Sequence, residues 1–219
     1  LNNGTATFDG LTATAGNNGS SMIDNHGTLT INSGSYTGGL DTVKNEPSAM
    51  LTISGGTFTL SKGTSRFTGV VFNYGTLEIT GGEFIQSDTG APYGYAQVIH
   101  TDKDGSVAPS TVIKGGTFKN LCTRSAAWTV RATNAAAGAT KVSGGTFNKS
   151  VGCYYFADGS VLAKNSDGTY GVREGQYVAS IGMTGYESLA DAIAAAEDDD
   201  TITLLKDIYE NVTIEAGQQ

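Results

Sequence analysis

Residues 51–58 read Leu51-Thr52-Ile53-Ser54-Gly55-Gly56-Thr57-Phe58, and this eight-residue pattern recurs along the chain. Four further copies occupy residues 29–36, 77–84, 111–118 and 140–147. The second glycine of the pair falls at positions 34, 56, 82, 116 and 145, so the steps are 22, 26, 34 and 29 residues. Leu1–Phe8 is interpreted as a degenerate first copy. Self-similarity at such periods indicates a repeat architecture.

Each copy combines apolar alternation with a glycine bend. Leu51 and Ile53 alternate with polar residues, which is typical of a half-buried strand. The glycine pair permits a bend, and Phe58 then begins a second inward-facing row. A third short apolar element precedes most copies, at Ile23–Asn25, Val43–Asn45, Val71–Asn73 and Val98–His100, where His100 takes the place of Asn. Three short strands per 22–34 residues is the size of one coil of a parallel β-helix.

These features predict an all-β fold, a right-handed parallel β-helix solenoid, because one coil cannot bury its apolar row unless coils stack. An antiparallel sandwich is the alternative, but it gives no reason for one octapeptide to return. The expected internal column consists of Ile31, Ile53, Ile79, Ile113 and Val142. The expected aromatic stack consists of Phe58, Phe84, Phe118 and Phe147. An amide ladder is expected from Asn25, Asn45 and Asn73.

Composition changes along the chain and suggests a division into three parts. Residues 1–150 hold 9 acidic and 10 basic residues, whereas residues 151–219 hold 12 acidic and 3 basic residues. We predict β-helix coils over 1–150, a small β-rich closing segment over 151–176, and the start of a following βαββ module over 177–219. Thr184 and Glu187 have the spacing of a capping box, which predicts a helix over about 185–197. Strands are expected at 201–205 and 212–214.

At this level the chain resembles a known group of proteins. The repeated Leu-x-Ile-x-Gly-Gly-x-Phe is similar to the coils of right-handed parallel β-helix (pectate-lyase-like) surface and adhesin modules of Gram-positive gut bacteria. Residues 143–170 resemble the segment that closes such domains, and residues 186–205 resemble the segment that opens the next one. The resemblance implies a secreted or surface-displayed module of a larger adhesin-like protein. Since the chain starts with Leu1 and no apolar leader, any secretion signal is expected outside it.

Charge and motifs exclude several functions. A net charge of -8 argues against nucleic-acid binding, and no apolar run is long enough for a membrane span. The acidic residues of 1–150 are scattered, without an Asp-Asp pair. We therefore assign no catalytic, cofactor-binding or metal-binding residues and expect no cofactor. His26 is interpreted as a turn residue. Asp102 begins a calcium-loop-like stretch, but Ile113 stands where its last acidic ligand belongs.

The two cysteines are candidates for a disulfide. Cys122 lies four residues after Phe118, and Cys153 lies six residues after Phe147. The two aromatic residues occupy the same place in consecutive coils, and coils stack about 4.8 Å apart, which suits disulfide geometry. We therefore expect a Cys122–Cys153 bond. Two buried free thiols are the alternative.

The longest coil separates Gly82 from Gly116, so an insertion must leave the solenoid within residues 87–95 or 102–110. Loops that project from a rigid scaffold often carry recognition, and aromatic and Arg residues are good contact anchors. The binding-surface candidates are Tyr93, Tyr95, Arg124, Trp128 and Arg131. The expected function is a monomeric, non-enzymatic extracellular adhesion module that contacts a host protein or glycoprotein, including an immunoglobulin, or a polysaccharide. A polysaccharide lyase or hydrolase and a structural spacer are the alternatives.

Overall fold

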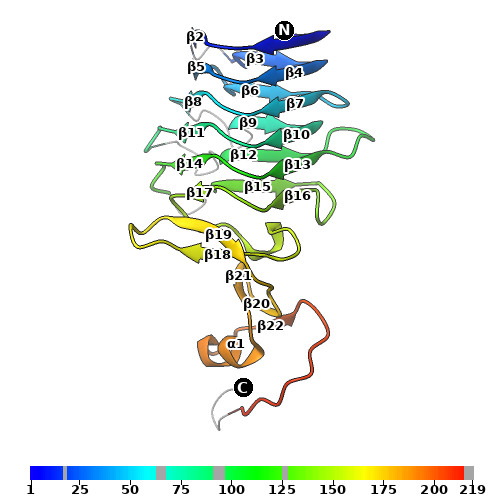
Figure 1. The fold of residues 1–219 in the computed structure, drawn as a ribbon, viewed down its shortest axis with the longest axis vertical. Coiled ribbons are helices and arrows are strands. Elements are labelled where there is room, and N and C mark those ends of the chain that lie inside the picture. Colours follow the sequence, from blue (N-terminus) through cyan, green and yellow to red (C-terminus); the bar gives the residue numbers. More distant parts are fainter. Residues whose placement is uncertain (17–18, 63–67, 91–96, 125–127, 215–219) are drawn as a thin grey trace.

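The main body of the protein is a parallel β-solenoid of about five turns, in which strands far apart in the sequence lie one above the other (Figure 1). This is a computed structural model of the chain, and it describes residues 1–16, 19–62, 68–90, 97–124 and 128–214. Within these residues no helix has the length and apolar character needed to cross a membrane. The parallel strand pairing confirms the predicted stack of coils, and three sheets form the walls of the solenoid.

Each sheet takes one strand from each coil. The six-stranded sheet consists of β1 (Thr5–Phe8), β4 (Thr28–Ile31), β7 (Met50–Ile53), β10 (Thr76–Ile79), β13 (Ser110–Ile113) and β16 (Thr140–Val142). The solenoid part of the eight-stranded sheet consists of β2 (Leu11–Ala15), β5 (Gly34–Gly38), β8 (Thr57–Leu60), β11 (Glu83–Gln86), β14 (Thr117–Asn120) and β17 (Thr146–Phe147). The five-stranded sheet consists of β3 (Ile23–Asn25), β6 (Val43–Asn45), β9 (Gly69–Asn73), β12 (Gln97–Asp102) and β15 (Val130–Thr133).

The strand register places side chains of the same type one above another inside the solenoid. Ile53 pairs with Ile31 on one side and with Ile79 on the other, and the column continues through Ile113 to Val142, all fully buried. The rings of Phe58 and Phe84 stack with centroids 5.0 Å apart. Tyr36 extends this aromatic column at one end, and Phe118 and Phe147 extend it at the other. The predicted internal columns are therefore confirmed.

In the copies that contain a glycine pair, the two glycines have different structural roles, as Gly115 and Gly116 show. Gly115 passes so close to the carbonyl oxygen of Thr80 on the coil before it that a Cβ would collide with it. Gly116 has a φ of +103°, a conformation that side-chain-bearing residues rarely adopt. One glycine thus allows the coils to approach, and the next allows the chain to turn into the following strand.

Two sequence assignments are corrected by the register. Phe8 pairs with Ile31, so the first copy of the octapeptide spans residues 6–13 instead of Leu1–Phe8. In β12, Ile99 continues the inward column of Val71, and Thr101 therefore takes the place of Asn73. His100 is displaced to the outward row beside Phe72. The error arose because β12 contains consecutive apolar residues, and only the pairing shows which of them points inward.

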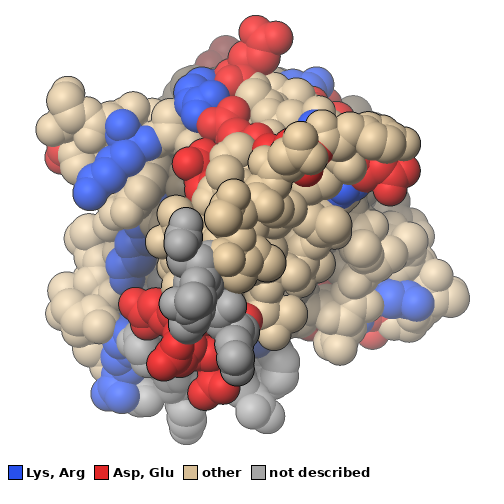
Figure 2. Space-filling view, turned by 90° about the horizontal axis from the view of Figure 1, so that it is seen from below, with Lys and Arg blue, Asp and Glu red and all other residues tan. Residues whose placement is uncertain are grey.

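The acidic C-terminal part continues the structure below the last coil (Figure 1). The hairpin of β18 (Ser160–Lys164) and β19 (Tyr170–Glu174) adds antiparallel to β17 and so extends the eight-stranded sheet. A separate three-stranded sheet contains β20 (Ala179–Ile181), β21 (Thr184–Tyr186) and β22 (Ile202–Leu204). Figure 2 looks onto this end and shows several groups of Asp and Glu side chains on it.

The single α-helix of the described residues is shorter than predicted. Helix α1 spans Leu189–Ala195, not 185–197, and packs on the three-stranded sheet. Thr184 belongs to β21, and the helix is capped by Ser188, whose hydroxyl accepts a hydrogen bond from the backbone N–H of Asp191 at 3.0 Å. Residues 212–214 form no strand in the structure. The expected capping box of Thr184 and Glu187 does not form, because Thr184 is held in β21 by its pairing with β20.

Candidate functional site

The outward row of the five-stranded sheet differs in chemistry from the outward row of the six-stranded sheet. In register, successive coils place Asp24, Lys44, Phe72, His100 and Arg131 on this face. The comparable row of the six-stranded sheet is Thr7, Thr30, Thr52, Glu78, Val112 and Lys141. Every position of the row on the five-stranded sheet is charged or aromatic, whereas three consecutive coils of the other sheet carry Thr in the comparable row.

This face is partly open over β3 and β6 and covered over β9 and β12. The central residues of β3 and β6 are partly exposed, whereas all residues of β9 and β12 are buried. Phe72 is only 4% exposed although it points outward, and its ring lies 4.6 Å from the rings of both Tyr74 and His100. The boundary between the open and the covered part is where a hollow forms.

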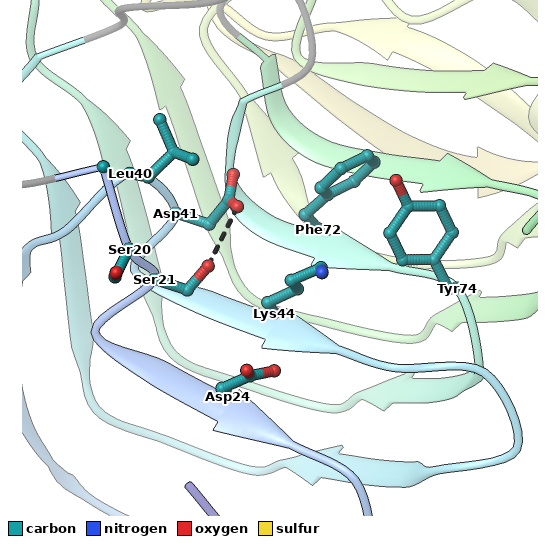
Figure 3. A pocket seen from close by; sticks show the side chains of 9 residues that line it. Ser20, Ser21, Asp24, Leu40, Asp41, Lys44, Phe72 and Tyr74 are labelled. Atoms are coloured by element: carbon teal, nitrogen blue, oxygen red, sulfur yellow. Dashed lines mark hydrogen bonds between the residues drawn. The ribbon is translucent and has the colours of Figure 1, made fainter.

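A pocket of about 380 Å³ lies at this boundary (Figure 3). Its lining combines two serine hydroxyls, two carboxyls, one ammonium group and two aromatic rings, one of which is a phenol. The lining residues are Gly19, Ser20, Ser21, Asp24, Leu40, Asp41, Lys44, Phe72 and Tyr74. We call this hollow the Asp41 pocket.

Asp41 is the most unusual group of the pocket. It is 2% exposed, and its carboxyl accepts hydrogen bonds from the backbone N–H of Gly69 at 2.9 Å and from the hydroxyl of Ser21 at 3.1 Å. Burial raises the pKa of Asp41 to about 7, although these two hydrogen bonds and the nearby Lys44 act in the opposite direction. A carboxyl with such a pKa is present in both protonation states near neutral pH.

Beside the pocket, two neighbouring coils bring four ionisable groups together. His26 Nε2 lies 3.4 Å from the Oδ2 of Asp24, and the ammonium of Lys44 pairs with the carboxylate of Glu46. Lys44 also lies 5.5 Å from the centre of the Tyr74 ring. Asp24, His26 and Glu46 each offer a ligand atom, and these atoms all lie within 4.8 Å of one another. Within the part of the chain that the structure describes, these three residues form the group that could hold a metal ion.

The sequence did not reveal this group because Glu46 lies 20 residues after His26 in the chain, although the two are neighbours on adjacent coils. From the sequence alone, His26 is interpreted as a turn residue, and no single coil contains all three of the possible metal ligands. The available signal was the shared period: His26 follows Asn25 as Glu46 follows Asn45, and the two Asn residues are in register. Aligning the coils by their Asn residues would have placed His26 beside Glu46.

His100 does not act at this site. It is fully buried, and its Nε2 lies 2.8 Å from the hydroxyl of Thr133. Burial lowers the pKa of His100 to about 3, and Arg131 on the next coil acts in the same direction. The ring is therefore neutral at physiological pH. Asp102, which begins the calcium-loop-like stretch, has hydrogen-bond partners within the protein. Its Oδ1 accepts hydrogen bonds from the N–H of Lys103 and from the side-chain amide of Asn134.

The binding-surface candidates from the sequence fall into three groups. Tyr93 and Tyr95 lie outside the described residues. Arg124 is exposed on the connection after β14. Trp128 and Arg131 are half-buried at the β15 end of the five-stranded sheet, where the carbonyl of Trp128 accepts a hydrogen bond from Asn120 and Arg131 is in register with His100. None of the described candidates lines the Asp41 pocket.

The expected disulfide between Cys122 and Cys153 is not formed, because both cysteines are free and buried. The strand pairing between β14 and β17 ends at Phe118 and Phe147, before either cysteine is reached. The chain leaves the coil at this point and enters the short 3₁₀ helix Cys153–Tyr155. There the N–H of Cys153 donates to the carbonyl of Met183, which turns the residue toward the C-terminal part.

Comparisons with known proteins provide no assignment: no family model, no curated protein and no solved structure matches this chain.

Proposed function

We propose that this chain is a non-enzymatic, extracellular binding module of a bacterial surface protein that contacts a host protein or glycoprotein, including an immunoglobulin, or a polysaccharide. One observation carries the proposal. The outward row of the five-stranded sheet is charged or aromatic in every coil, although parallel stacking alone requires only residues compatible with a strand. Side chains that the fold does not need are candidates for recognition.

On this face, the Asp41 pocket is the proposed contact site for the ligand. Hydroxyls of Ser20 and Ser21 and the carboxyls of Asp24 and Asp41 can exchange hydrogen bonds with the hydroxyl groups of a sugar. The rings of Phe72 and Tyr74 supply the apolar part of the lining, and a few polar groups in a partly apolar hollow give orientation and specificity. We therefore place a glycan, either free or on a glycoprotein, against this pocket.

The test is a pull-down from host mucus and serum, run beside a glycan array. The binding variant is Lys44→Ser with Tyr74→Ala, which changes the partly exposed side chains of the pocket. Its control is Glu78→Gln with Lys141→Ser, which changes the outward row of the six-stranded sheet. We expect wild type and control to capture the same ligand and the pocket variant to lose it at an unchanged melting temperature. Capture by all three proteins alike would exclude this pocket as the binding site.

A polysaccharide hydrolase is the second candidate, and one observation favours it. Asp41, with a pKa of about 7, and Asp24 line the same hollow, and glycoside hydrolysis uses one protonated and one ionised carboxyl. Release of reducing ends from polysaccharides by the wild type, lost in both Asp24→Asn and Asp41→Asn, would establish this function. Binding without such release supports the binding module, and neither binding nor release supports a structural spacer.

A further inference from the structure

The cluster beside the Asp41 pocket contains the donor set of a transition-metal site. Asp24 and His26 lie two residues apart, so both point to the outside of the same coil. Glu46 comes from the next coil and is in register with His26, which follows from the pairing of Asn25 with Asn45. Their ligand atoms lie within 4.8 Å of one another, so small side-chain rotations suffice to bring all three to one ion.

The donor types select the class of ion. One imidazole nitrogen with two carboxylates suits zinc and neighbouring first-row divalent ions, whereas calcium and magnesium prefer oxygen ligands alone. The side chains of His26 and Asp24 are 44% and 36% exposed, so an ion and its remaining water ligands have access from solvent.

A second observation points to a missing partner. The Oδ1 atom of Asp24 is buried and has no hydrogen-bond partner among the described residues. A buried carboxylate oxygen without a partner is costly, and buried polar atoms in proteins are nearly always satisfied. The other oxygen, Oδ2, faces His26 at 3.4 Å, so an ion held by both oxygens of Asp24 would remove this cost.

Lys44 is the competing cation. Its ammonium now neutralises Glu46, and a divalent ion at the same carboxylate would repel it. Lys44 has alternative neighbours in the Tyr74 ring and the Asp41 carboxyl, both of which line the pocket. Figure 3 shows its side chain lying across the pocket between Asp24 and Tyr74.

We propose that Asp24, His26 and Glu46 bind one zinc-class divalent ion, and that binding displaces the ammonium of Lys44 from Glu46. The site shares Asp24 and Lys44 with the Asp41 pocket, but its zinc binding is measured without any glycan.

The first test titrates the chelator-treated full chain with zinc chloride in a calorimeter. We expect one zinc per chain, weakening of at least about tenfold in His26→Asn and in Glu46→Gln, and no heat with magnesium chloride. The chain has 2 histidines, so imidazole NMR provides a residue-specific check. Zinc should shift the ring signals of His26 and leave those of the buried His100 unchanged. Absence of saturable binding, or an undiminished affinity in His26→Asn, would overturn the proposal.

The second test addresses the displaced lysine. Lys44→Met removes the competing ammonium and is expected to bind zinc about tenfold more tightly than wild type. Lys114→Met is the control, because the ammonium of Lys114 also pairs with a carboxylate, that of Glu78, and no histidine of the described residues completes a ligand group there. Its zinc affinity should equal that of the wild type. Equal affinity of Lys44→Met and wild type would refute the displacement.

Discussion

The side-chain amide of Asn45 donates a hydrogen bond to the Oδ1 of Asn73 on the next coil at 2.8 Å. Asn25 donates to Asn45 in the same way at 2.7 Å, so one amide follows another along the inner corner of the solenoid. The Nδ2 of Asn45 also reaches the backbone carbonyl of Thr76 at 3.1 Å. The ladder therefore satisfies turn carbonyls that stacking leaves without strand partners.

Replacing Asn45 should destabilise the protein more than its size suggests. Asn45→Ala leaves the amide groups of Asn25 and Asn73 without their shared partner inside the solenoid. Each buried group left unsatisfied costs about 1–3 kcal/mol, so we expect a total loss of roughly 3–5 kcal/mol. Urea unfolding measures it, with Asn32→Ala on the exposed surface as the control. A loss under 1 kcal/mol would mean that the ladder contributes little net stability.

The column of aliphatic side chains gives a second prediction. Ile79 is fully buried between Ile53 and Ile113, and neighbouring coils cannot collapse into a void because backbone hydrogen bonds fix their spacing. Ile79→Ala is expected to cost roughly 2–5 kcal/mol. Met50→Ala, at a position that is 54% exposed on the same sheet, should change the midpoint of unfolding much less. Comparable effects of both substitutions would contradict the inward orientation of Ile79.

The cysteines give a third prediction. Cys122 is 1% exposed and Cys153 is 5% exposed, and neither is bonded to the other. Freshly purified protein should react with a thiol reagent slowly when folded and reveal two free thiols per chain in denaturant without reductant. Burial raises the pKa of the Cys153 thiol, which slows its reaction further. Finding no free thiol under denaturing conditions would restore the disulfide.

The repeat explains why so much of the solenoid was predictable. Leu51, Ile53 and Phe58 return at the same places in several copies, so their inward orientation in one coil implies it in the others. Prediction failed where a copy departs from the pattern. In β12 two apolar residues precede His100, and only pairing with β9 decides that Ile99 points inward. After Phe147 the coil ends, so counting along the chain no longer gives positions in space.

The candidate site was predicted less well, for a different physical reason. The outward row has no apolar pattern to reveal it, because each coil places a different residue there. Asp41 lies on the connection between β5 and β6, and its burial depends on Ser21 and Gly69 from other coils. Aromatic and Arg content favours Tyr93 and other loop residues as binding candidates, whereas the described pocket is lined by side chains of β3, β6 and β9 and their connections.

Asp41 gives the last prediction, a dependence of stability on pH. Burial raises its pKa from 3.8 to about 7 in the folded protein. Between these values the unfolded chain has lost the proton and the folded chain still holds it. Because the folded state binds more protons, the contribution of Asp41 to stability falls as pH rises from about 4 to about 7, by up to roughly 4 kcal/mol in total, and is constant above that.

Asp41→Asn should remove this dependence. The amide can still accept from the N–H of Gly69 and can donate to the hydroxyl of Ser21, and it carries no charge to bury. The free energy of unfolding of the variant, measured with urea at several pH values, should exceed that of wild type at pH 8 and approach it near pH 4. Asp167→Asn is the control of opposite sign, because hydrogen bonds from Thr169 lower the pKa of the exposed Asp167. That control should show no gain at pH 8. If the difference between Asp41→Asn and wild type does not change with pH, Asp41 is ionised in the folded protein throughout this range, and its proposed role as the protonated carboxyl of a hydrolase is excluded as well.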